Sequence, residues 1–144
     1  MILLDVNVVV ATHRADSALH GEARPWLDNL IASGGPFSVP SVVWGSFVRI
    51  TTNHRIFSVP TPLDDAFHFA RAIIAQPNHR TVEPGDRHFA IFERLCHDGG
   101  AVGDLSPDAY LAAIAIEHGA TWASFDRDFA RFEGLQWVVP RVAS

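Results

Sequence analysis

Short apolar runs alternate along this chain with longer segments in which apolar residues recur at helical spacing. The runs at 2–5, 37–40, 121–125 and 135–139 predict short buried strands, and residues 80–83 predict a further strand. Helical spacing predicts helices over 6–13, 18–35, 41–53, 63–76, 86–98, 106–119 and 126–132. The alternation indicates an α/β three-layer sandwich, with a central mainly parallel sheet of about 4–5 short strands flanked by about seven helices.

Several residues mark the predicted ends of the helices. Gly34 follows the second helix, where a glycine ends a helix without steric cost. Ser41 and Ser106 are predicted N-caps, because a serine hydroxyl accepts a hydrogen bond from a free backbone N–H. Pro107 then fits the first helical position and Gly119 the C-cap of the same helix.

Composition limits the class of protein. A length of 144 residues predicts a single domain spanning 1–144, and no apolar run is long enough to cross a membrane. The N-terminus lacks a basic region and a cleavage site, so we do not expect a signal peptide. The only cysteine, Cys96, has no internal disulfide partner, which favours the cytoplasm.

The net charge of −5 argues against a protein that binds nucleic acid through its overall charge. It leaves open an enzyme that reaches phosphates through a bound cation. All 11 basic residues are arginines, and the chain contains no lysine.

Three acids fall where a parallel sheet gathers its ligands. Asp5 ends the first predicted strand, Asp126 follows TWASF, and Asp108 lies in the first turn of a helix. The carboxyl ends of strands meet at one crevice, so these carboxylates can converge there. Converging carboxylates raise each other's pKa unless a cation neutralises them, and hard oxygen ligands suit Mg²⁺ or Mn²⁺.

The same acids also have plain structural readings. An aspartate in a first helical turn favours the helix dipole, and one after a strand is a common turn residue. Asp5 is harder to explain in this way, because an acid between two apolar runs costs free energy without a partner.

A phosphatase is the alternative enzyme class. DVNVV is similar to the nucleophile loop of haloacid-dehalogenase-type phosphatases, which place a second aspartate two residues after the first. Here that residue is Asn7, which cannot transfer a proton, and the lysine that holds the phosphoryl group in those enzymes is missing. The chain also has no glycine-rich phosphate loop, no G-x-S-x-G motif and no zinc-ligand spacing.

Three stretches carry a family resemblance: LLDVNVVVA, FVRITTNHRIF and DAYLAAIAIEHGATWASFDRDF. Together they resemble a PIN domain, and more closely the VapC-type toxins of type II toxin–antitoxin systems in a branch abundant in mycobacteria. The resemblance runs from residue 1 to about 132. It implies a metal-dependent endoribonuclease that is neutralised by a VapB-type antitoxin and forms homodimers and toxin–antitoxin hetero-oligomers.

The resemblance also implies a role for each matching residue. Asp5, Asp108 and Asp126 would hold Mg²⁺, with Mn²⁺ as a substitute, and carry catalysis. A water would attack the scissile phosphate and leave a 3′-hydroxyl and a 5′-phosphate. The supporting positions are Asn7, Ser124 and Asp128.

One departure from the family pattern affects the acidic site. The family has a glutamate in the helix after the second strand, where SVVWGSFVRI has no acid. Trp44 or Ser46 occupies that place, and Asp104 is either a replacement ligand or a loop residue. The site is therefore weakly active, active with another acid, or an inactive PIN module that binds RNA or antitoxin.

Two arginines near this helix are candidate RNA contacts. Arg49 and Arg55 suit phosphate through their bidentate geometry, and they equally suit pairing with acids or capping the helix. The aromatic-rich stretch 37–57 could help form a groove for an antitoxin helix. Core packing is the simpler role for Phe47 and Phe57 within it.

Overall fold

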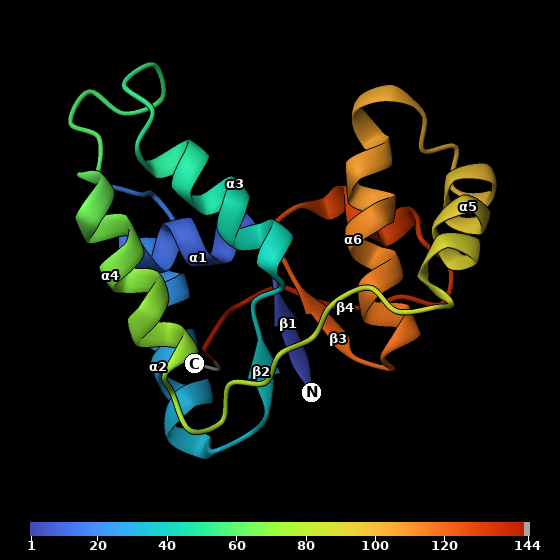
Figure 1. Cartoon of the computed structure of the whole chain (residues 1–144), viewed down its shortest axis with the longest axis horizontal. Coiled ribbons are helices and arrows are strands. Elements are labelled where there is room, and N and C mark those ends of the chain that lie inside the picture. The colour runs from blue at the N-terminus through green and yellow to red at the C-terminus, as the bar shows by residue number, and fades with distance from the viewer. Residues whose placement is uncertain (143–144) are drawn as a thin grey trace.

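The computed structural model describes residues 1–142 and contains one sheet of four parallel strands (Figure 1). Strand order is β2-β1-β3-β4, so β1 and β3 are central neighbours. In register, Leu4 of β1 lies opposite Ala123 of β3. The residues that follow them, Asp5 and Ser124, therefore leave the sheet side by side. The strands are β1 (Ile2–Leu4), β2 (Phe37–Ser38), β3 (Thr121–Ala123) and β4 (Gln136–Val138).

Helices lie on either side of this sheet. Figure 1 shows α1 to α4 on one side and α5 and α6 on the other, which confirms the predicted α/β sandwich. No helix within residues 1–142 is long and apolar enough to cross a membrane. The α-helices are α1 (Val6–His13), α2 (His20–Ser33), α3 (Ser41–Thr51), α4 (Leu63–Ile74), α5 (His88–Asp98) and α6 (Ser106–Glu117), and the 3₁₀ helices are η1 (Gly103–Leu105) and η2 (Arg127–Arg131).

The predicted strand at 80–83 is wrong, because pairing with β2 stops after a single bridge between Phe37 and His79. The Arg80 N–H donates to the Phe37 carbonyl at 2.8 Å. The N–H of Val39, the residue after β2, bonds instead to the ring nitrogen Nε2 of His79 at 3.3 Å. The side chain of His79 thus takes the hydrogen bond that a longer strand would have used.

Both predicted serine N-caps are also wrong. Ser41 is the first residue of α3, and its N–H and hydroxyl donate to the Glu83 carboxylate at 2.8 and 2.6 Å. Ser106 is the first residue of α6, and its hydroxyl donates backwards to the Gly103 carbonyl at 2.8 Å. Gly34 is confirmed as the C-cap of α2, whereas the C-cap of α6 is His118 and Gly119 follows it. Both glycines adopt the left-handed backbone (φ +74° and +63°) that glycine takes without strain.

The core on the α1–α4 side contains an aromatic cluster. Phe47 of α3 is fully buried and stacks on Phe69 of α4, with ring centroids 5.5 Å apart. The rings of His13 and Trp44 pack edge-on against Phe47 at 5.5 and 5.4 Å. This cluster fixes α3, whose other face borders the candidate site.

Replacing Phe47 with alanine should therefore lower the free energy of unfolding by about 3–5 kcal/mol, the usual cost of emptying a buried phenylalanine site. Urea denaturation followed by circular dichroism measures this. Phe89→Ala is the matched control, because Phe89 is 73% exposed on α5 and its loss should change stability by less than about 0.5 kcal/mol. Equal effects of the two substitutions would contradict the assigned core.

Candidate metal centre

Asp5 occupies the carboxyl end of β1 and is 4% exposed. Its Oδ1 accepts a hydrogen bond from the Val6 N–H at 2.7 Å, which makes Asp5 the N-cap of α1. Its Oδ2 accepts the Ser124 hydroxyl at 2.6 Å. One carboxylate thereby starts the first helix and joins the ends of the two central strands.

Asn7 and Ser124 complete a hydrogen-bond network around this carboxylate. The Asn7 amide nitrogen donates to Ser124 Oγ at 3.0 Å, and its oxygen accepts the Phe125 N–H at 3.2 Å. Ser124 Oγ also accepts the Asp126 N–H at 3.0 Å. The network therefore sets the backbone direction from Ser124 to Asp126.

Three further acids lie together beside Asp5. One carboxylate oxygen from each of Asp108, Asp126 and Asp128 lies within 4.8 Å of the others, and we call these residues the acidic trio. Asp108 comes from the first turn of α6. Asp126 is the N-cap of η2, and its Oδ1 accepts the Asp128 N–H at 2.9 Å. Oxygen ligands at this spacing fit a hard divalent cation.

Charges within the acidic trio affect the pKa of Asp5. The pKa of Asp5 is raised to about 6, mainly by burial and also by the charges of Asp108 and Asp126, while the hydrogen bonds from Ser124 and Val6 lower it. The pKa of Asp108 is also raised to about 6, mainly by burial and also by the charges of Asp126 and Asp128. A cation that binds among these carboxylates stabilises their charged forms.

Arg131 is a member of this region that the sequence analysis missed. Its guanidinium lies 3.9 Å from Asp128 and lowers the pKa of Asp108, partly balancing the negative charge. The signal was available, because an arginine three residues after an acid lies on the same face of a helix.

The remaining predicted site residues lie apart from the acidic trio. Asp104 is exposed in η1 and is not part of the trio. Arg49 is exposed in the last turn of α3, and Arg55 is exposed in the loop that follows. The roles of these three residues stay predictions.

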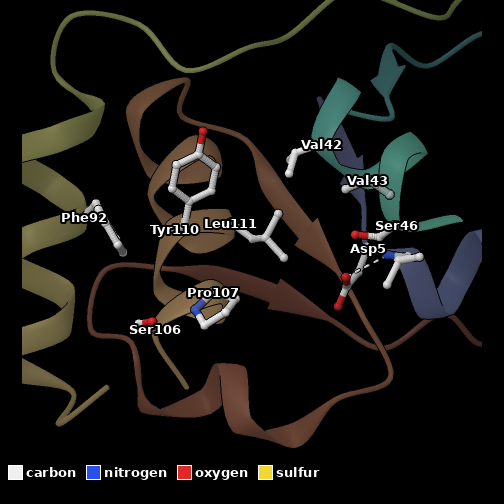
Figure 2. A pocket seen from close by; sticks show the side chains of 10 residues that line it. Asp5, Val42, Val43, Ser46, Phe92, Ser106, Pro107, Tyr110 and Leu111 are labelled. Carbon is white, nitrogen blue, oxygen red and sulfur yellow. Dashed lines mark hydrogen bonds between the residues drawn. The ribbon is translucent and has the colours of Figure 1, made fainter. Parts of the chain in front are cut away.

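The structure shows which of Trp44 and Ser46 faces Asp5. Ser46 lines a pocket together with Asp5 (Figure 2). Trp44 points into the aromatic cluster, with its ring 5.4 Å from that of Phe47. The residue of α3 beside Asp5 is therefore a serine, where a glutamate would add a fifth acid to Asp5 and the acidic trio.

The pocket between α3 and α6 has a volume of about 370 Å³. Figure 2 shows the Asp5 carboxylate at one side of it, next to Ser46. We call it the α3–α6 pocket; its lining residues are Asp5, Val6, Val42, Val43, Ser46, Phe92, Ser106, Pro107, Tyr110 and Leu111.

Comparisons with known proteins identify the family. The PIN domain model matches residues 2–135. The chain is 50% identical over 142 residues to ribonuclease VapC25 of Mycobacterium tuberculosis, covering 99% of this chain and 100% of that protein. It is 42% identical over 140 residues to VapC ribonuclease Mb2897 of Mycobacterium bovis, covering 97% and 95%. The chain therefore belongs to the PIN-domain family and, within it, groups with the mycobacterial VapC proteins.

Solved structures share the fold. VapBC2 from Rickettsia felis, bound to a promoter DNA fragment, matches with a TM-score of 0.71 at 15% identity over 96% of this chain and 98% of that one. FitAcB from Neisseria gonorrhoeae matches with a TM-score of 0.68 at 22% identity over 97% and 98%. These likenesses and the family match confirm the predicted PIN-like fold.

The raised pKa of Asp5 predicts a pH-dependent gain in stability for Asp5→Asn without metal. Between pH ~4 and ~6 the folded wild type holds a proton more tightly than the unfolded chain, so its stability falls as the pH rises. Above pH ~6 the charged, buried carboxylate costs about 1–3 kcal/mol, which the neutral amide avoids. The variant should melt above wild type at pH 8 and match it near pH 4.

Thermal melts in EDTA at both pH values measure this difference. Asp28→Asn is the control, because Asp28 is exposed on α2 and pairs only with Arg24 in the described chain. A gap between Asp5→Asn and wild type that is the same at both pH values would contradict the electrostatic origin.

Proposed function

We propose that this protein is a metal-dependent endoribonuclease and the toxin of a VapBC-type toxin–antitoxin pair. The observation that carries the proposal is the acidic trio beside the buried Asp5, on the fold of proteins named VapC ribonucleases. The proposed ligands and catalytic residues are Asp5, Asp108 and Asp126, with Asp128 as a further acid of the cluster.

The donor set fits Mg²⁺, with Mn²⁺ as a substitute, because every candidate ligand is a carboxylate. When bound, such a cation polarises a phosphodiester and lowers the pKa of water. The chain's own contribution is to hold the acids in place: Ser124 orients Asp5, and the Asp128 N–H orients Asp126. Arg131 limits the repulsion among them.

The substrate follows from this centre. A centre that neutralises phosphate charge through a cation allows a protein of net charge −5 to bind RNA. Arg49 and Arg55, both exposed, are proposed to contact phosphates outside the centre. We propose that a water attacks the phosphorus and the P–O3′ bond breaks, so that the products carry a 3′-hydroxyl and a 5′-phosphate.

A protein partner is supported by the surface of α4. Leu63, Phe67 and Ile74 recur on one face of this helix and are 56%, 46% and 48% exposed. Apolar side chains exposed at helical spacing are typical of a face that another protein covers. We propose a VapB-type antitoxin as partner, in hetero-oligomers that include a homodimer of this chain, in the cytoplasm.

A second candidate is a PIN module that binds RNA or antitoxin without cutting. Ser46 favours it, because one acid fewer lowers the negative charge available to hold a cation. A phosphatase has no comparable support, because the Asn7 amide is engaged by Ser124 and the Phe125 N–H and is not an acid/base group.

Asp108→Asn and Asp126→Asn should each reduce Mg²⁺-dependent cleavage of RNA by at least about 10²-fold, because each removes a charged ligand from the centre. Cleavage of a labelled single-stranded RNA, resolved on a gel with and without EDTA, measures the loss. Asp28→Asn should cleave like wild type. Full activity in both site variants would exclude the proposed centre, and an inactive wild type would favour the non-cutting module.

Ser46→Glu should tighten metal binding, because it adds a carboxylate beside Asp5 at the position of the family's glutamate. We expect the Mg²⁺ concentration for half-maximal cleavage to fall by about tenfold, roughly 1.4 kcal/mol of binding free energy. Ser46→Gln, with the same length and no charge, is the matched control. If both variants respond alike, the charge of the site is not what limits metal binding.

A further inference from the structure

The α3–α6 pocket starts at the candidate metal centre and leads away from it. Asp5 and Val6, the first residue of α1, belong to its lining, and the rest of the wall comes from α3, α5 and α6. Figure 2 shows Val42 and Val43 facing Leu111 and Tyr110 across the pocket. A phosphate held at the centre would therefore have this pocket beside it.

The lining is mostly apolar, which does not suit a phosphate or a sugar. Val42, Val43, Pro107 and Leu111 supply aliphatic surface, and Tyr110 supplies an aromatic ring. A volume of about 370 Å³ lies in the range of pockets that hold small organic groups. The part of an RNA chain with matching chemistry is the base.

Tyr110 is held rigidly for stacking. Its ring meets that of His88 at 4.4 Å and that of Phe92 at 5.5 Å, both edge-on. His88 is buried, and its Nε2–H donates to the Tyr110 carbonyl at 2.9 Å. A ring fixed in advance loses little freedom when a base packs against it.

Hydroxyl groups are available to read the base edge. Ser46, Ser106 and Tyr110 line the pocket, and Ser106 Oγ already donates to the Gly103 carbonyl. The hydroxyls of Ser46 and Tyr110 form no hydrogen bond within residues 1–142, so they can bond a base. A serine at position 46 therefore leaves space in the pocket and supplies a neutral hydroxyl, where a glutamate would place a negative charge.

We propose that the α3–α6 pocket receives one unpaired base of the RNA, from a nucleotide next to the phosphodiester held at the metal centre. The inference rests on the proposed RNA-cleaving function and deepens it. A base paired in a duplex cannot enter the pocket, so the site selects single-stranded RNA, whose bases can turn outward and stack on aromatic side chains.

The test compares two chains that share phosphates and differ in bases. One is a labelled single-stranded RNA 12-mer of mixed sequence, and the other is the same ribose–phosphate chain without bases. Binding is measured by fluorescence anisotropy with Ca²⁺ in place of Mg²⁺. Wild type should bind the RNA at least about tenfold more tightly, the range expected for one stacked base.

Tyr110→Leu should bring the two affinities to within about twofold, because it keeps apolar volume and removes the ring. Phe89→Leu is the matched control: it loses an exposed ring on the same side of the sheet and should keep the tenfold preference. Val42→Trp, at a position 40% exposed, fills the pocket without disturbing the core and serves if Tyr110→Leu does not fold.

The outcomes separate the two proposals. Equal binding of both chains by wild type, or an unchanged preference in both pocket variants, overturns the base pocket. If wild type cleaves RNA in Mg²⁺ under either of those outcomes, the proposed function stands without the pocket. If wild type shows the preference and cleaves nothing, the pocket stands and the proposed catalysis is wrong.

Discussion

The 2.6 Å hydrogen bond from the Ser124 hydroxyl to Asp5 joins the ends of the two central strands, and the site is built outward from it. The other Asp5 oxygen caps α1, so the same carboxylate sets the exit of β1 and the start of the first helix. Ser124 in turn accepts the Asp126 N–H and fixes the approach to η2. Burying the Asp5 carboxylate, whose pKa is raised to about 6, costs free energy of folding when it is charged, and a cation bound nearby offsets that cost.

The serine at position 46 links the metal centre to the α3–α6 pocket. A glutamate there would add charge to the acids and project into the same space. With Ser46, the centre is less negative and the pocket beside it is larger and more apolar. In the functions proposed here, weaker metal binding and room for a base both follow from this one residue, and Ser46→Glu would change both.

Much of the fold could be predicted, because it depends on local periodicity. The apolar runs at 2–5 and 121–125 predict buried strands, and glycine at 34 and 119 predicts helix ends from backbone sterics alone. Two of the errors, at residues 80–83 and at Ser41, come from long-range contacts, whereas the hydroxyl of Ser106 bonds locally to the Gly103 carbonyl. His79 takes a strand's hydrogen bond through its side chain, and Ser41 bonds to Glu83, 42 residues away, which no local pattern reveals.

The sequence by itself determined the strand–helix alternation, the acids at the strand ends and the family, because these are properties of spacing and residue type. Only the tertiary structure decided that Asp128 joins Asp108 and Asp126 while Asp104 stays outside, since that depends on how α6 and η2 pack. It also decided that Ser46, and not Trp44, faces Asp5. Two residues apart on a helix point in different directions, and only the packing of α3 against α4 fixes which one meets the site.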